Sequence, residues 1–107
     1  MTELEKIIIG MISSSGESKT KAFEALKKVK TGEYDAARQL LNEAREADLK
    51  AHQIQTKLIQ AEMSDSGDKV EVGLLMVHAQ DHYMTSQLAR DVIEALVDVF
   101  ETKEGGN

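Results

Sequence analysis

The feature that most constrains the fold is a helical repeat of apolar and small side chains that starts near the N-terminus. These side chains recur at every third or fourth position, the spacing that places residues on one face of an α-helix. The repeat keeps its phase through the serine-rich cluster at residues 13–18, whose composition alone would favour a loop. We therefore expect one long helix over about residues 3–30. Its stripe consists of Leu4, Ile8, Met11, Ser15, Ser18, Ala22, Ala25 and Val29.

Two further helices of similar length follow. Lys30 in the last turn and Gly32 just beyond it suit a left-handed cap that ends the first helix. The same spacing then predicts helices over about 33–63 and 70–102, separated by the Ser-Asp-Ser-Gly-Asp loop at 64–68. With no Pro and 4% aromatic residues, the core must be built from aliphatic side chains and Ala. Short turns between long helices predict an all-α, antiparallel, up-down-up three-helix bundle that forms a single domain over residues 1–107.

Composition excludes several classes of protein. The chain has no Cys, which excludes disulfides, thiolate zinc sites and thiol nucleophiles, and which fits the reducing cytoplasm. Its longest apolar run, residues 7–12, is far shorter than the roughly 20 residues that a membrane helix needs. The first residues lack the basic segment of a secretory signal. A net charge of -6 argues against nucleic acid as a partner.

The third predicted helix carries more apolar surface than a three-helix monomer needs. In its second half the apolar side chains cover more than one face of the helix, whereas packing against two neighbours requires one broad stripe. This surplus predicts contacts with other copies of the chain. The residues concerned are Leu88, Ala89, Val92, Ile93, Leu96, Val97, Val99 and Phe100.

A polar strip interrupts this apolar helix. Asp81 and His82 lie three and four residues after His78, and Thr85 lies seven residues after it, so the four side chains share one face. The same spacing continues to Leu74 and Leu75 before the strip and to Leu88, Ala89, Val92, Leu96 and Val99 after it, as in a buried seam. If the antiparallel helices rise equally, His78 lies level with Gln55 and Asp81 lies level with His52. We therefore expect the three histidines to converge, with Gln55 and Thr56 beside them.

Three interpretations of this cluster compete. The histidines could be hydrogen-bonded structural groups at a subunit contact, although the polar density is higher than such a contact needs. They could hold a metal ion, because His78 and His82 are one turn apart and Asp81 could add an oxygen, but the pattern is neither H-E-x-x-H nor the pair of Glu-x-x-His motifs of a di-iron bundle. The third interpretation is a phosphohistidine relay, which needs an accessible imidazole on a rigid element and a surface for partner proteins.

The chain resembles a known family at these same residues. Residues 4–102 look like the lactose/cellobiose-type enzyme IIA of the bacterial sugar phosphotransferase system, a family that includes chitobiose components. The resemblance rests on the string H-x-Q-D-H-x-M-T at 78–85, on Ala-His followed by Gln-Thr at 51–56, and on Asp-Val-Ile at 91–93.

This resemblance implies a function and an assembly. It implies a homotrimer of three-helix subunits, nine helices in all, in which His78 accepts a phosphoryl group on Nε2 from phospho-HPr. The group then passes to a cysteine of the cognate IIB and on to a sugar that enters through the IIC permease. The resemblance also implies that Asp81 of all three subunits holds one Mg²⁺ or other divalent cation, and it implies no organic cofactor.

The remaining candidate site residues are His82, Gln80, Gln55, His52 and Thr56. His82 either contacts the phosphoryl group, orients His78 or is a packed structural group, and Gln80 faces a different side of the helix, so that its role depends on a neighbouring subunit. Since no Arg or Lys lies within the string, we expect docking partners to compensate much of the phosphate charge. The alternative to a relay is a trimeric helical metal-binding or scaffold protein without phosphoryl transfer.

Overall fold

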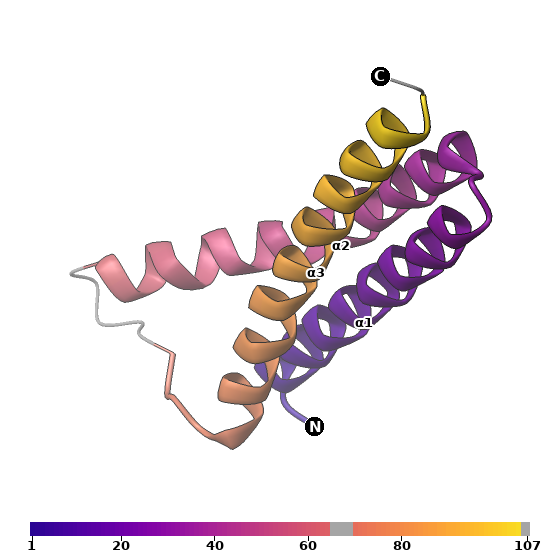
Figure 1. Cartoon of the computed structure of the whole chain (residues 1–107). Helices are drawn as coiled ribbons and strands as arrows, with labels where there is room; N and C mark the ends of the chain where they lie inside the picture. The colour runs from indigo at the N-terminus through magenta and orange to yellow at the C-terminus, as the bar shows by residue number, and fades with distance from the viewer. Residues whose placement is uncertain (65–69, 106–107) are drawn as a thin grey trace.

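Three long helices make up the fold. The computed structural model describes residues 1–64 and 70–105, and in these ranges the chain forms α1 (Glu3–Lys30), α2 (Tyr34–Met63) and α3 (Leu74–Glu104), with no strand. The helices run up, down and up, which gives an elongated body of 58 × 26 × 19 Å (Figure 1). The predicted all-α three-helix fold is confirmed. Residues 65–68 of the predicted loop lie outside the described residues.

Local sequence sets the ends of α1. At its start Thr2 and Glu5 form a capping box, in which the Thr2 hydroxyl accepts from the Glu5 amide and the Glu5 carboxylate accepts from the Thr2 amide. At its end Gly32 takes the left-handed conformation, with φ of 72°. The Glu33 amide then donates to the Lys28 carbonyl over 2.9 Å, which closes the predicted glycine cap.

The start of α3 differs from the sequence prediction. The helix begins at Leu74 rather than at residue 70, and it ends at Glu104 rather than at 102. Gly73 is the N-cap residue with an extended backbone, and its carbonyl accepts the first helical hydrogen bond from Val77. Gly73 and the β-branched Val72 both have low helix propensity, so the segment before Leu74 stays extended although its apolar spacing fits a helix.

The core consists of two apolar clusters with a polar layer between them. One cluster lies toward the turn between α1 and α2 and contains Ala22, Ala25, Val29, Ala37, Leu41, Ile93 and Val97. The other lies toward the start of α3 and contains Ile8, Met11, Ala51, Met76, Ala79 and Tyr83. Between the clusters the buried side chains are Ser15, Ser18, Asp48 and Ser86. The many small residues bring the helix axes close together.

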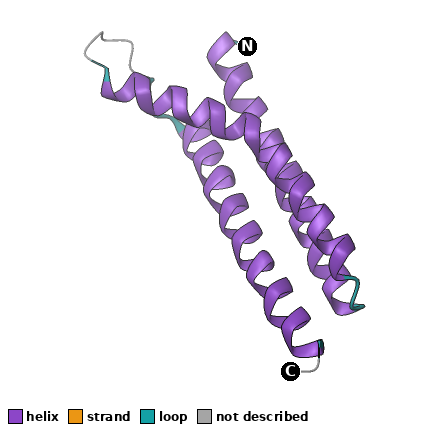
Figure 2. Ribbon diagram, turned by 90° about the horizontal axis from the view of Figure 1, so that it is seen from above, coloured by secondary structure: helices purple, strands orange, loops and turns teal. Residues whose placement is uncertain are grey.

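The second half of α2 diverges from α1, as both Figure 1 and Figure 2 show. A cleft of about 380 Å³ opens on its α1 side, lined mainly by apolar residues such as Ile7 and Ile54. A second cleft of about 310 Å³ opens between this half of α2 and the start of α3, lined by residues that include Ile59, Val77 and Gln80. Both clefts lie at the end of the bundle that carries His78.

The stripe of α3 that contains His78 is not part of the subunit core. The core face of α3 consists of Met76, Ala79, Tyr83, Ser86, Ile93 and Val97, whereas Leu88, Val92 and Val99 are exposed in the single chain. The prediction of a buried seam is therefore wrong within one subunit. These exposed residues form an apolar outer face on α3, which is the kind of surface that the predicted contacts between subunits require. In the described parts of the chain, no helix combines the length and the hydropathy needed to cross a bilayer.

Candidate functional site

The polar strip lies on the outer face of α3. His78, Asp81 and Thr85 are exposed, and His82 is half-buried. The rings of His78 and His82 meet edge to face, with their centroids 4.5 Å apart and an angle of 74° between the ring planes. The strip is therefore formed as predicted, and the imidazole of His78 is open to an approaching molecule.

His82 differs from His78 in its surroundings. Its Nδ1 atom is buried and has no hydrogen-bond partner among the residues that the structure describes. Burial lowers the pKa of His82, the nearby charges of Lys19 and His78 lower it further, and Asp81 opposes them. The neutral form of His82 is therefore favoured beside His78.

A lysine of α1 reaches the strip, which sequence reasoning missed. Lys19 Nζ donates to Thr85 Oγ1 over 2.8 Å, and the Thr85 hydroxyl in turn donates to the carbonyl of Asp81 over 2.7 Å. No Lys or Arg lies within the string itself, and Lys19 lies 66 residues before Thr85 in the sequence. The available signal was that Lys19 follows Ser18, a member of the predicted core stripe of the first helix.

Gln55 and Gln80 bind each other. Gln55 Nε2 donates to Gln80 Oε1 over 2.7 Å, and Gln80 Nε2 donates to Gln55 Oε1 over 2.6 Å. Gln55, expected level with His78, thus contacts Gln80 of its own chain, and this pair ties the turn after His78 to α2. Thr56 is exposed and donates its hydroxyl proton to the backbone carbonyl of His52.

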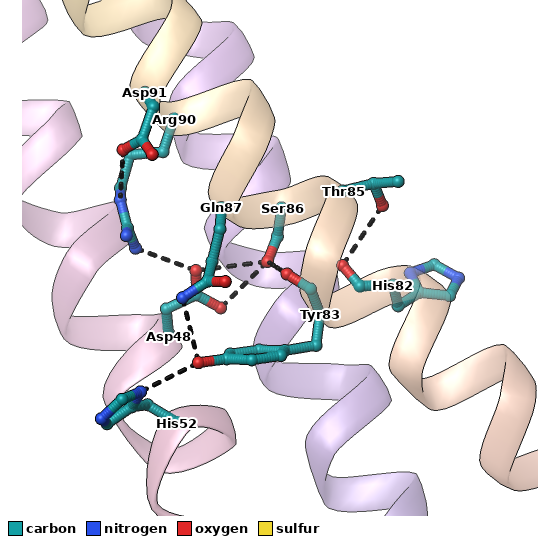
Figure 3. Close-up of polar contacts among 9 residues, drawn as sticks. All are labelled: Asp48, His52, His82, Tyr83, Thr85, Ser86, Gln87, Arg90 and Asp91. Atoms are coloured by element: carbon teal, nitrogen blue, oxygen red, sulfur yellow. Dashed lines mark hydrogen bonds and ion pairs between the residues drawn. The ribbon is translucent and has the colours of Figure 1, made fainter. Parts of the chain in front are cut away.

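The structure does not bring His52 together with the other two histidines. His52 Nδ1 lies 2.9 Å from the hydroxyl of Tyr83, and this hydroxyl also accepts from Gln87 Nε2 over 3.0 Å. Figure 3 shows His52 at the hydroxyl end of Tyr83, while His82 points away on the other side of α3. The predicted convergence was wrong because helical rise fixes the height of a residue along the bundle and leaves open which face it occupies.

A buried carboxylate anchors the same part of α3 to α2. Asp48 is only 3% exposed and accepts from Ser86 Oγ over 3.1 and 3.2 Å and from Arg90 over 2.9 Å (Figure 3). Burial raises the pKa of Asp48, although the hydrogen bond from Ser86 and the charge of Arg90 act against this. Helical spacing puts Asp48 on the same face as the buried Ala44 and Ala51, but it does not identify the partners of Asp48 on α3.

Asp81 is the candidate ligand for a cation. Within the described residues of one chain, no group of three or more His, Cys, Asp and Glu side chains lies close enough to hold a metal ion. The Asp81 carboxylate is exposed on the outer stripe of α3, and a carboxylate oxygen is the ligand type that Mg²⁺ prefers. One carboxylate supplies too few ligands for a cation, so a site at Asp81 would need ligands from outside this chain.

Comparison with known proteins gives consistent matches. Residues 6–101 match the family described as "PTS system, Lactose/Cellobiose specific IIA subunit". The N,N'-diacetylchitobiose-specific EIIA component of Escherichia coli K12 is 42% identical over 99 residues, which cover 92% of this chain and 84% of that protein. The lichenan-specific enzyme IIA component of Bacillus subtilis is 40% identical over 92% of this chain and 88% of that protein.

Solved structures agree in sequence and in fold. The crystal structure of the cellobiose-specific enzyme IIA from Bacillus anthracis superposes with a TM-score of 0.91 at 34% identity, over all of this chain and 96% of that one. The solution structures of the chitobiose IIA–HPr complex of Escherichia coli match with a TM-score of 0.79 at 41% identity, over 97% of this chain and 99% of that one. Sequence, fold and the strip at His78 therefore lead to one conclusion: the chain belongs to the lactose/cellobiose-specific IIA family of the phosphotransferase system.

Proposed function

We propose that this chain takes a phosphoryl group from phospho-HPr on Nε2 of His78 and passes it to the cysteine of its cognate IIB. As a member of the family the chain is a phosphotransferase component and a phosphocarrier. The observation that carries the assignment to His78 is the exposure of this imidazole on the outer face of a rigid helix. A protein 41% identical to this chain has been solved in complex with HPr, which supports HPr as the donor.

The chemistry needs a neutral imidazole at His78. The lone pair on Nε2 attacks phosphorus, the bond from phosphorus to the donor breaks, and its electron pair leaves with the donor. In the second half of the cycle, the thiolate of IIB attacks the same phosphorus, and the electron pair of the N–P bond returns to Nε2. The chain has the same composition before and after each cycle, as a relay must.

We assign supporting roles to the surrounding side chains. His82, whose ring meets that of His78 edge to face, orients the His78 ring or donates to the phosphoryl oxygens. The Gln55–Gln80 pair holds the turn after His78 against α2. His52, through Tyr83, and Thr56, through the His52 carbonyl, act farther away as positioning groups.

Labelling the protein tests the relay. Incubation with phosphoenolpyruvate, enzyme I and HPr should add one acid-labile, base-stable phosphoryl group per chain, and His78→Ala should abolish it. His52→Ala is the matched control, because loss of a positioning group that is bonded to Tyr83 can change the rate of labelling but should leave its final extent unchanged. Wild-type protein that stays unlabelled would support the alternative, a helical scaffold or metal-binding protein without transfer.

We further propose a cytoplasmic homotrimer in which the outer faces of α3 meet and the three Asp81 carboxylates share one Mg²⁺ or other divalent cation. The exposed apolar residues on both sides of Asp81 support this contact. Three carboxylates close together repel one another, and the charge of a bound cation relieves that repulsion. Relatives named for chitobiose, lichenan, lactose and cellobiose suggest a sugar of this type, delivered through a IIC permease.

Substitution of Asp81 tests the shared site. Asp81→Leu removes the repulsion, so the variant should remain a trimer in the presence of EDTA, whereas the wild-type trimer should weaken when divalent cations are removed. Sedimentation velocity with and without EDTA measures both. Dissociation of Asp81→Leu into monomers in Mg²⁺ would contradict this account of the contact.

A further inference from the structure

Lys19 brings a positive charge from α1 to the strip that carries His78. Its ammonium group donates to the hydroxyl of Thr85 over 2.8 Å and is close enough to the half-buried His82 for the two to interact electrostatically. The His82 ring in turn lies 4.5 Å from that of His78. Lys19, His82 and His78 therefore follow one another along the outer side of the bundle.

A groove on the surface of α1 extends to His82. It has a volume of about 500 Å³ and is lined by residues of α1, among them Lys19, Phe23 and Lys27, together with His82. Lys27 lies eight residues after Lys19 on the same helix, about 12 Å farther from the strip at 1.5 Å per residue. The groove thus holds two lysines and one carboxylate, Glu24, and Lys19 is the lysine that is fixed by Thr85 beside His82.

We propose that Lys19 is a charge-compensating residue of the relay, which stabilises the phosphoryl group while it resides on His78. This inference rests on the proposed function. The phosphoryl group carries close to two negative charges at neutral pH, and a cation near the edge of a protein interior attracts it more strongly than a cation in bulk water would. The hydrogen bond from Lys19 to Thr85 holds the ammonium group in place before the phosphoryl group arrives, so that little ordering is needed during transfer.

The proposed role of Lys19 predicts a change in the equilibrium of phosphoryl transfer. Loss of the cation removes an attraction that exists only in the phosphorylated chain. The equilibrium constant for transfer from phospho-HPr should therefore fall in Lys19→Met by about tenfold at low salt, and the difference should shrink as ionic strength rises. A purely structural lysine would not produce this dependence on salt.

The experiment mixes purified phospho-HPr with the full chain and measures the phosphorylated fraction of each protein at equilibrium. Wild type is compared with Lys19→Met, with Lys19→Arg, which keeps the charge, and with Lys27→Met, a matched loss of charge in the same groove. We expect Lys19→Arg to restore most of the equilibrium constant and Lys27→Met to stay within about twofold of wild type, because Lys27 lies about 12 Å farther along α1 and the attraction between charges weakens with distance. Circular dichroism confirms that each variant is folded.

The outcomes separate this inference from the proposed function. Labelled wild type with an unchanged equilibrium constant in Lys19→Met would overturn the role of Lys19 and leave the relay intact. An equal loss in Lys19→Met and Lys19→Arg would overturn it as well, because the charge would then not matter. An unlabelled wild type would overturn the relay and this inference with it.

Discussion

The three histidines show how surroundings give one residue type different roles. His78 is exposed, His82 has a buried Nδ1, and His52 has its Nδ1 bonded to Tyr83. A nucleophilic nitrogen must be within reach of the partner, and the exposed position of His78 on the outer face of α3 meets this condition. The His52 ring is bonded to Tyr83 and the His82 ring lies against that of His78, which suits a positioning role for both.

Asp48 gives a prediction about pH at the scale of one residue. Burial raises the pKa of Asp48 in the folded chain above the ordinary value of 3.8. Between 3.8 and this raised pKa, the folded chain therefore keeps a proton that the unfolded chain has lost. The free energy of unfolding must then fall as pH rises through this interval and level off above it. In Asp48→Asn this contribution is absent.

The measurement is urea denaturation of both proteins at a series of pH values from about 4 to 8, at one fixed protein concentration. The stability of wild type relative to Asp48→Asn should decrease as pH rises above 3.8. A relative stability that increases with pH would show that Ser86 and Arg90 outweigh burial.

Residues within the strip could be predicted from sequence, but residues that reach it from other helices could not. His78, Asp81, His82 and Thr85 share a face because of helical spacing, which a single sequence reveals. Lys19 meets Thr85 only because α1 packs beside α3, and His52 meets Tyr83 instead of the other histidines because of how α2 is rotated. Packing angle and rotation are tertiary properties that the spacing of residues along the chain does not reveal.

At the scale of the element, helix ends followed local chemistry where a strong signal existed. Gly32 was predicted to cap α1 and does so with a positive φ. The start of α3 was placed too early, because apolar spacing continues through residues 70–73 while Val72 and Gly73 oppose helix formation. Spacing identifies a helix, and single residues decide where it ends.

Two glycines give opposite predictions. Gly32→Ala puts a Cβ on a residue with φ of 72° and should cost about 1–2 kcal/mol of unfolding free energy. Gly16 lies within α1, where an added Cβ would meet nothing within 4 Å, so Gly16→Ala should add about 0.5–1 kcal/mol. Urea denaturation of the two variants checks both values. A loss of stability in Gly16→Ala would contradict the description of α1 as one continuous helix.

At the scale of the whole molecule, α3 has one face toward the subunit core and another toward the outside. Ile93 and Val97 are buried, while Leu88, Val92 and Val99 are about half exposed or more. The sequence revealed the surplus of apolar residues but not which of them face inward. Their exposure in one chain is what the proposed trimer would remove.

Leu88→Glu tests this face directly. Leu88 is 62% exposed in the single chain, so the charge should leave the subunit fold intact and should weaken association, because it would be buried at the contact between subunits. Sedimentation equilibrium measures association, and circular dichroism measures helix content. Met63→Glu, on an exposed residue at the end of α2, is the control and should assemble as wild type does. Association unchanged by Leu88→Glu would contradict a trimer formed through the outer face of α3.

The central claim is that the phosphoryl group resides on Nε2 of His78. The measurement that tests it most directly is ¹⁵N and ³¹P NMR of the chain, labelled in its histidines and phosphorylated by HPr. The account predicts that one imidazole changes, that it belongs to His78, and that the changed nitrogen is Nε2. A phosphorylated nitrogen on His52 or His82, or on Nδ1 of His78, would contradict it.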